Sequence, residues 1–94
     1  MTYRLAFSET ALKEWKKLGH TLQEQFKKKL RERLENPRVP ASQLHGRKDQ
    51  YKIKLRGAGY RLVYRVEDGI LTIIVVGIGK RENDDIYNMT QNRT

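Results

Sequence analysis

The sequence predicts an α+β fold in which two N-terminal helices pack on one face of a small, mainly antiparallel β-sheet, with a short helix ending the chain. Apolar residues recur at helical spacing in the first third of the chain. Polar and apolar residues alternate on both sides of a glycine turn at residues 57–59, and an almost continuous apolar run follows at residues 70–78. With 94 residues, the chain is expected to form one domain, residues 1–94, around a single core.

The chain is expected to begin with a strand over residues 2–7, because Tyr3, Leu5 and Phe7 alternate with polar or small residues. Ser8 then offers a hydroxyl that can cap a helix. Gly19 is expected to end that helix in a left-handed conformation. The apolar face of this helix would hold Ala11, Leu12, Trp15 and Leu18.

The clearest helix in the sequence follows this glycine. Thr21 and Glu24 have the spacing of a capping box, in which each side chain satisfies a backbone donor at the start of a helix. Apolar residues then recur every four positions, at Leu22, Phe26, Leu30 and Leu34. Asn36 precedes Pro37 and is therefore pushed out of helical conformation, which ends the helix. Residues 38–50 have little periodicity and are predicted to form a loop.

The segment 51–65 carries five basic side chains and no acidic one. Because strand side chains alternate between faces, burying the apolar residues on both sides of the turn places the basic residues together on the opposite, exposed face. These residues are Lys52, Lys54, Arg56, Arg61 and Arg65. Like charges on neighbouring strands destabilise a sheet, so their convergence favours a binding site for a polyanion over a merely solvated face.

A second tight turn is predicted at residues 67–69, and residues 70–78 have the pattern of a central strand covered on both faces. Lys80 and Arg81 follow this strand. Asp84 and Asp85 are expected in the first turn of the C-terminal helix, where the helix dipole favours acidic side chains. The sheet face away from the two N-terminal helices is expected to be open.

Net charge and composition restrict the class of protein. The net charge is +9, yet residues 66–94 carry three basic and five acidic side chains, so the positive charge is concentrated and favours nucleic acid as a partner. The absence of cysteine excludes disulfides and thiolate metal sites. No segment approaches the roughly 20 apolar residues that span a bilayer. We expect a cytoplasmic protein with no membrane association, no metal and no cofactor.

Familiar catalytic sets are missing, since His20 and His45 are separated and neither has an obvious carboxylate partner in the sequence. Cations and a phenol can instead assist attack of an RNA 2′-hydroxyl on its neighbouring phosphate, which leaves a 2′,3′-cyclic phosphate. In this interpretation Arg61 stabilises the charge of the transition state, and Lys52 or Lys54 acts as general base.

Two residues near the C-terminus complete this hypothesis. Arg81 would neutralise the leaving 5′-oxygen, and Tyr87 would stack on a base and hold the scissile linkage in line. The alternatives, in which Arg81 only solubilises the end of a strand and Tyr87 only packs against the sheet, remain open.

Five segments of the chain resemble the RelE toxins of bacterial type II toxin–antitoxin systems, namely residues 11–15, 44–46, 51–56, 59–64 and 79–82. The resemblance covers nearly the full chain. It implies a microbial-RNase-like fold and a metal-independent endoribonuclease, or mRNA interferase, that cuts messenger RNA in the ribosomal A site and inhibits translation. The catalytic residues of the family carry over onto Lys52, Lys54, Arg61, Arg81 and Tyr87.

The resemblance also implies partners, namely a cognate RelB-like antitoxin, the 70S ribosome with its 16S rRNA, and mRNA. The residues expected to bind RNA are His45, Arg56, Arg65 and Lys80. His45 departs from the family's pattern, in which an arginine is expected at this place in the loop. Basic residues of the two N-terminal helices either contact ribosomal RNA or form a solvated face; they include Lys13, Lys16, Lys17, Lys27 and Lys28.

Two other functions remain open at this point. One is a ParE-like toxin of the same superfamily, which binds DNA gyrase and cuts no RNA. The other is a basic RNA-binding module without chemistry. The presence of all five catalytic candidates argues against both.

Overall fold

The computed structural model describes residues 2–80, which fold into two α-helices and a four-stranded sheet. In chain order, these elements are β1 (Arg4–Phe7), α1 (Glu9–Lys16), α2 (His20–Glu35), β2 (Gln50–Leu55), β3 (Tyr60–Glu67) and β4 (Thr72–Lys80). Short 3₁₀ helices, η1 (Pro40–Ser42) and η2 (Asp68–Ile70), precede β2 and β4. None of the helices within this part of the chain is long and apolar enough to cross a membrane.

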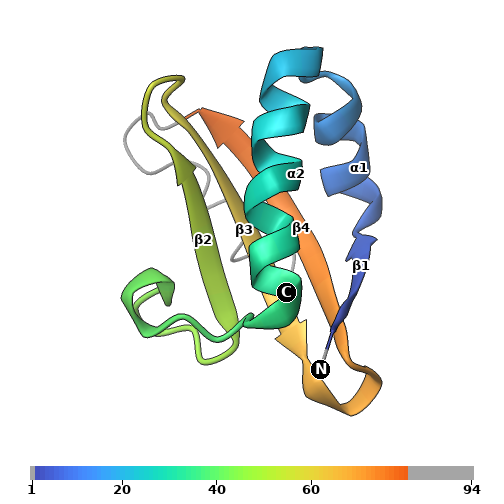
Figure 1. Cartoon of the computed structure of the whole chain (residues 1–94), viewed down its shortest axis with the longest axis vertical. Coiled ribbons are helices and arrows are strands. Elements are labelled where there is room, and N and C mark those ends of the chain that lie inside the picture. The colour runs from blue at the N-terminus through green and yellow to red at the C-terminus, as the bar shows by residue number, and fades with distance from the viewer. Residues whose placement is uncertain (1, 81–94) are drawn as a thin grey trace.

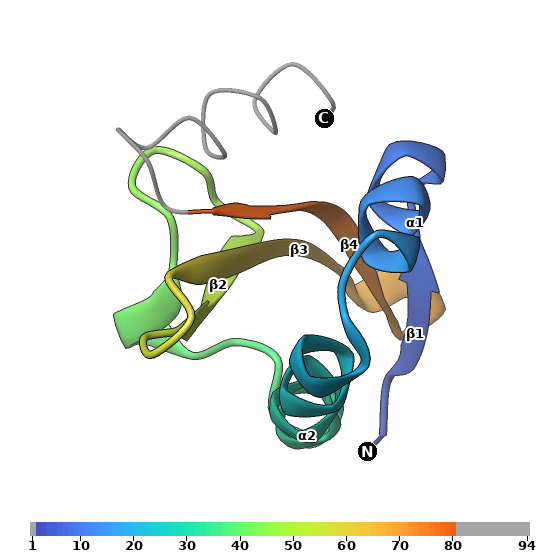
Figure 2. The same ribbon diagram turned by 90° about the horizontal axis from the view of Figure 1, so that it is seen from above.

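The sheet has the strand order β1-β4-β3-β2, with β1 parallel to β4 and the other neighbours antiparallel. Figure 1 shows α2 crossing in front of the sheet, and Figure 2 shows α1 beside the end formed by β1 and β4. The α+β class and the mainly antiparallel sheet are therefore confirmed. The predicted C-terminal helix lies outside the described residues.

One hydrophobic core joins both helices to the sheet. Ala11 of α1 and both Phe26 and Leu30 of α2 are buried in it, and Trp15 lies between the rings of Phe7 and Phe26, with centroid distances of 5.3 and 6.4 Å. The sheet contributes the residues that alternate toward the helices: Tyr51, Ile53, Leu55, Leu62, Tyr64, Val66, Ile73, Val75 and Ile78. Removal of this apolar surface from water is the main force that holds the helices on the sheet.

The other face of the sheet is not open, so that expectation was wrong. Leu44, from the loop before β2, packs against Val63 and Val76 on this face. Val63 and Val76 are only 0% and 2% exposed. The loop folds back over the sheet, a long-range contact that the alternation pattern of the strands does not contain.

The start of α1 agrees with the sequence prediction, but the turn into α2 does not. The Ser8 hydroxyl accepts a hydrogen bond from the backbone N–H of Ala11 at 3.1 Å and caps α1. Gly19, however, is extended, with φ −66° and ψ 159°, and it precedes α2 without a side-chain cap. Because α2 begins at His20, Thr21 already lies in its first turn, and the predicted capping box is absent.

The Gln23 side chain explains this early start. Its amide nitrogen donates a hydrogen bond to the backbone carbonyl of Trp15 at 2.9 Å, which ties the first turn of α2 to the end of α1. A tertiary contact thus replaces the local cap. The other end of α2 follows the prediction, since the helix ends at Glu35, before Asn36 and Pro37.

Strand β4 is interior in the sheet, as predicted, but it begins at Thr72 because Ile70 and Leu71 still belong to the turn. Val63 pairs with Gly77 and the next residue of β3, Tyr64, pairs with Val75, so Val76 is an extra residue in β4. One extra residue reverses the alternation, so that the side chains after it point to the opposite faces of the sheet. This bulge allows Val75 before it and Ile78 after it to enter the same core.

Among the described residues, no strand pairs with the bulged end of β4 on its β1 side, since the pairing of β1 with β4 ends at Phe7 and Val75. The Glu14 side chain of α1 takes the place of that strand, because its Oε1 accepts a hydrogen bond from the backbone N–H of Ile78 at 3.0 Å. A helix side chain therefore accepts a hydrogen bond from a buried backbone N–H that would otherwise have no acceptor.

This contact makes Glu14 a test of the bulge. We expect Glu14→Ala to lower the free energy of unfolding by about 1–3 kcal/mol, because it leaves the N–H of Ile78 without its acceptor. Glu14→Gln retains an oxygen acceptor and should lose clearly less. Urea unfolding of the three proteins measures the difference, and equal stability of all three would contradict this account of the bulge.

A polar network fastens the turn before β4 to the N-terminal segment and to the loop before β2. The Tyr3 hydroxyl donates to Asp68 Oδ1 at 2.6 Å, and Arg38 donates to Asp68 Oδ2 at 2.6 Å and to Asp49 Oδ1 at 3.1 Å. The Tyr3 hydrogen bond, and after it that of Arg38, lowers the pKa of Asp68. The folded state therefore favours the carboxylate form of this residue.

Stability should depend on pH through this carboxylate. Because the pKa of Asp68 is lower in the folded than in the unfolded state, its contribution is present above about pH 4 and is lost as the pH falls further. The wild-type protein should be more stable than Asp68→Asn at pH 7, and this difference should shrink on acidification. Urea unfolding from pH 7 to pH 2.5 measures it, with Glu32→Gln as a control for the loss of one exposed negative charge. A difference that is independent of pH would refute the role of the network.

Candidate functional site

The basic residues of the β2–β3 hairpin lie on the face of the sheet opposite to the helices. In the antiparallel register, Lys54 is paired with Arg61, Lys52 with Val63 and Gln50 with Arg65. Paired residues share a face, and Val63 belongs to the cluster on the side away from the helices. The arrangement predicted from alternation is therefore observed for these four cations.

Arg61 lies much deeper than expected. It is 5% exposed, whereas its neighbour Lys54 is exposed, so the expectation that Arg61 stands on an open surface was wrong. Its two cross-strand partners are Lys54 on β2 and Gly79 on β4, and the glycine adds no side chain beside the guanidinium. A cation removed from water is screened less, so it attracts an anion more strongly than a surface arginine does.

A pocket of about 330 Å³ lies at the hairpin turn. The turn is closed by Gly59, which has φ +69° and donates its N–H to the carbonyl of Leu55 at 2.9 Å. Among the described residues, the lining consists of Lys54, Leu55, Arg56, Gly59, Tyr60 and Arg61. Three of the six are cations and none is acidic, so the pocket is suited to a phosphate group.

The other predicted RNA-binding cations do not line this pocket. Arg65 is on the same face as Arg61 but four residues along β3, or about 13 Å away. Its Nε lies 2.8 Å from Oε1 of Glu67, which offsets its charge. Lys80 is exposed and is paired with Tyr60, so it lies at the end of the sheet where the pocket is but on the helix-facing side.

Within residues 2–80, neither histidine lines the pocket at the hairpin turn. His20 is exposed at the start of α2. His45 is exposed in the loop before β2, where it lines a shallow hollow of about 500 Å³ that shares no described residue with the pocket at the turn. Leu44, directly before it, anchors that loop on the cationic face. Arg81 and Tyr87 lie outside the described residues, so their roles stay predictions.

Arg33 of α2 is a site residue that the sequence pattern did not reveal. Its guanidinium donates to the Tyr64 hydroxyl at 2.9 Å, to Oγ of Ser42 at 3.1 Å and to the backbone carbonyl of Lys52 at 3.3 Å. It therefore joins α2 to the loop before β2 and to β2 itself, at the backbone of Lys52. Only its position beside the apolar stripe of α2 could have suggested such a role.

The buried Tyr64 completes this junction. Its hydroxyl donates to the carbonyl of Pro37 at 2.7 Å while it accepts from Arg33. Burial raises the pKa of Tyr64, and the nearby guanidinium of Arg33 opposes that rise. The phenol therefore remains a hydrogen-bond donor and holds the segment after α2 against β3.

Metal ligation is a separate question. Residues 2–80 contain no group of three or more His, Asp or Glu side chains placed to hold a metal ion. The chemistry available in this part of the chain is that of closely spaced ammonium and guanidinium groups.

Comparison with known proteins gives consistent matches over nearly the whole chain. The profile of a family described as the ParE toxin of type II toxin–antitoxin systems matches residues 5–85. The mRNA interferase toxin RelE of Escherichia coli is 56% identical over 88 residues, which are 94% of this chain and 93% of that protein.

Two solved structures agree with this relationship. A mutant of the E. coli toxin RelE in the free state superposes with a TM-score of 0.91 at 53% identity, covering 99% of this chain and 98% of that one. The toxin chain of the E. coli RelBE toxin–antitoxin complex has a TM-score of 0.82 at 57% identity, covering 86% of this chain and 99% of that one.

Proposed function

Because the chain belongs to the RelE family of type II toxin–antitoxin toxins, we propose that it is an mRNA interferase, an endoribonuclease that cuts messenger RNA on the ribosome and so inhibits translation. The observation that carries the proposal is the direct pairing of Lys54 with Arg61 beside a pocket lined by three cations. The name of the E. coli relative, mRNA interferase toxin, supports the same activity.

The reaction is an internal transfer at one phosphate of the message. The 2′-oxygen of the upstream ribose forms a bond to phosphorus, and the bond from phosphorus to the 5′-oxygen of the next nucleotide breaks. The products are a 2′,3′-cyclic phosphate and a 5′-hydroxyl. The proton of the 2′-hydroxyl passes to a base, and the leaving oxygen gains a proton, so no metal and no cofactor is consumed.

Each catalytic candidate has a part in this reaction. Arg61 offsets the negative charge that develops on the phosphate oxygens, as groups aimed at a transition state do. Lys52 or Lys54 accepts the proton of the 2′-hydroxyl. Arg81 neutralises the leaving 5′-oxygen, and Tyr87 stacks on a base to align the linkage.

Dependence on the ribosome follows from how little acid–base machinery the described part of the site has. His20 and His45 are both exposed and neither lines the pocket at the turn. Such a site gains most when another structure holds the message in reactive geometry, because positioning alone can lower a barrier by several kcal/mol. We assign that task to the ribosomal A site, with 16S rRNA contacting the basic helices.

The proposal includes a neutralising antitoxin and a cytoplasmic location for the protein. The E. coli toxin has been solved in complex with its antitoxin RelB, so a RelB-like partner would neutralise this chain. The net charge of +9 suits a partner that is acidic. Action on translating ribosomes places the protein in the cytoplasm.

A gyrase-binding toxin is the second candidate, because the matching family profile is described by the name ParE. The 56% identity to RelE over 94% of the chain favours the RNA reaction. The pairing of Lys54 with Arg61 also favours RNA over gyrase, since a pocket lined by three cations is suited to an RNA phosphate.

The role of Arg61 can be tested by replacement with glutamine. We expect Arg61→Gln to slow cleavage of a ribosome-bound message about 10²- to 10³-fold, the usual cost of removing one group that stabilises a transition state. The rate is measured on purified ribosomes carrying a defined message, with cut sites mapped by primer extension. Because Arg61 is buried, circular dichroism and thermal unfolding must show that the variant is folded. Arg4→Gln, at an exposed position on β1 outside the basic helices, is the matched control. Cleavage by folded Arg61→Gln at the wild-type rate would remove Arg61 from the mechanism.

Attack by the 2′-hydroxyl can be tested by removing that hydroxyl from the message. A message with 2′-deoxyribose directly upstream of the cut should resist cleavage, because it has no nucleophile, while the all-ribose message should yield a 2′,3′-cyclic phosphate. Mass spectrometry of the products distinguishes the two. Cutting of the deoxy-substituted message at the same linkage would exclude this mechanism. Intact transcripts with DNA damage after induced expression would favour the gyrase alternative.

A further inference from the structure

A second cationic cleft, of about 700 Å³, lies at the outer edge of the sheet, between α2 and β2. Its basic side chains are Lys29, Arg33, Lys52, Lys54 and Arg56, and the other described residues that line it are neutral. Two of these five cations, Lys29 and Arg33, come from α2 and have no part in the reaction described above. The cleft therefore extends the positive surface well beyond the catalytic candidates.

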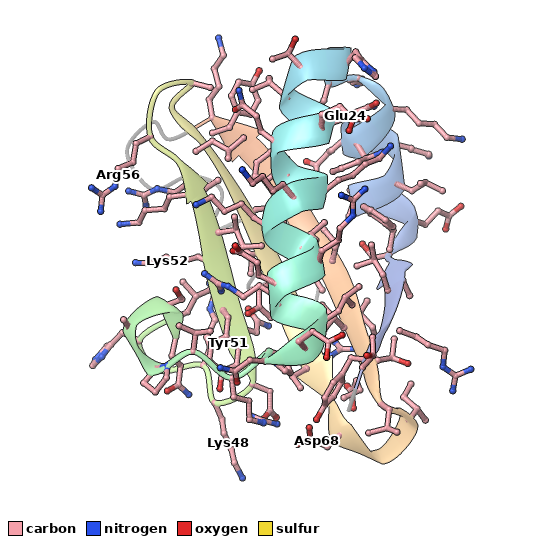
Figure 3. The ribbon with its side chains drawn as sticks, viewed as in Figure 1. Glu24, Lys48, Tyr51, Lys52, Arg56 and Asp68 are labelled. Carbon is pink, nitrogen blue, oxygen red and sulfur yellow. The ribbon has the colours of Figure 1, made fainter. Side chains whose placement is uncertain are left out.

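The position of β2 in the sheet creates this cleft. Since β2 is an edge strand, side chains from its outer face can meet side chains of α2 around the free edge. Figure 3 shows Lys52 extending from β2 and Arg56 extending from the turn after it, both at this outer edge. On α2, Lys29 and Arg33 are one turn apart and so lie on one side of the helix.

The charge of Arg33 is available to a ligand although its position is fixed. Its three hydrogen bonds within residues 2–80 go to neutral oxygens, those of Tyr64, Ser42 and the Lys52 carbonyl. These bonds orient the guanidinium without cancelling its charge. A preoriented guanidinium is well suited to phosphate, and an exposed lysine such as Lys29 adds a flexible ammonium.

The cleft is continuous with the pocket at the hairpin turn, because Lys54, Leu55 and Arg56 line both. A strand of RNA that places one phosphate between Lys54 and Arg61 would therefore extend from the pocket into the cleft that Lys29 and Arg33 also line. Contacts of this kind hold the backbone in register and read no base sequence.

We propose that this cleft binds the phosphate backbone of the message on one side of the scissile linkage, a role that rests on the proposed function. Lys29 and Arg33 are positioning residues in this proposal. They hold the flanking phosphates while the reacting phosphate lies at Arg61. Continuity with the pocket at the turn favours the message over ribosomal RNA as the occupant.

The test pairs a change in the protein with a change in the RNA. Ribosomes are programmed with messages that carry one uncharged methylphosphonate linkage at successive positions flanking the cut, each on a 2′-O-methyl nucleotide. The references are messages with the same 2′-O-methyl nucleotide and an ordinary phosphate. For the wild-type protein, we expect at least about fivefold slower cleavage at one to three linkages on one side, the effect of losing a charge-assisted hydrogen bond.

The protein variants then locate this effect. Lys29→Gln should cut the reference message more slowly and should lose its sensitivity to at least one of those linkages, because the contact is already gone. Arg31→Gln makes the same change in charge on another side of α2 and should keep the full sensitivity of the wild type. A merely structural role for Lys29 would slow every message equally.

Other outcomes overturn the proposal in distinguishable ways. If no flanking linkage affects the wild-type rate, or if Lys29→Gln keeps the wild-type sensitivity, the message does not occupy the cleft. If Lys29→Gln also binds ribosomes without message more weakly, the occupant is ribosomal RNA. Failure of the wild-type protein to cut the unmodified message would refute the proposed function itself.

Discussion

The register between β2 and β3 is the constraint on which both the core and the cationic surface depend. Tyr51 and Ile53 enter the core only if Lys52 and Lys54 leave it, because successive side chains point to opposite faces. Burying one large apolar side chain contributes about 1.5–3 kcal/mol, whereas a like-charge pair across strands costs at most about 1 kcal/mol. Burial therefore prevails, and Lys54 stays opposite Arg61 despite their repulsion. A shift by one residue would exchange the two sets of side chains.

Most elements of the fold could be predicted from the sequence because their signals are local. The leucine stripe of α2, the alternation of β2 and β3 and the proline after α2 all act within a few residues. The turn between the helices could not be predicted in this way. Gly19 and Thr21 have the composition of an ordinary helix end and cap, but the contact of Gln23 with the carbonyl of Trp15 decides where α2 begins. The bulge at Val76 likewise depends on packing rather than on a local motif.

For the candidate site, the sequence predicted the face of the sheet on which the cations lie but not how deeply each of them is buried. Alternation places Lys54 and Arg61 on one face. It does not reveal that Lys54 is exposed whereas Arg61 is buried, with 5% of its surface exposed. The roles of Arg33 and Leu44 could not be predicted, for a related reason. Each acts on a strand from a separate element, and only the fold brings them there. Arg81 and Tyr87 lie outside the described residues, so the resemblance to the RelE toxins remains the basis for their roles.

The cations along β2 have a further consequence because this strand lies at the edge of the sheet. Unpaired backbone groups on an edge strand can recruit the same strand of another molecule, and projecting lysines oppose such pairing. Lys52 and Lys54 would therefore keep toxin molecules apart through the same charge that attracts RNA. Variants in which these lysines are neutralised can lose activity through self-association alone. Their oligomeric state must be known before a loss of cleavage is attributed to chemistry.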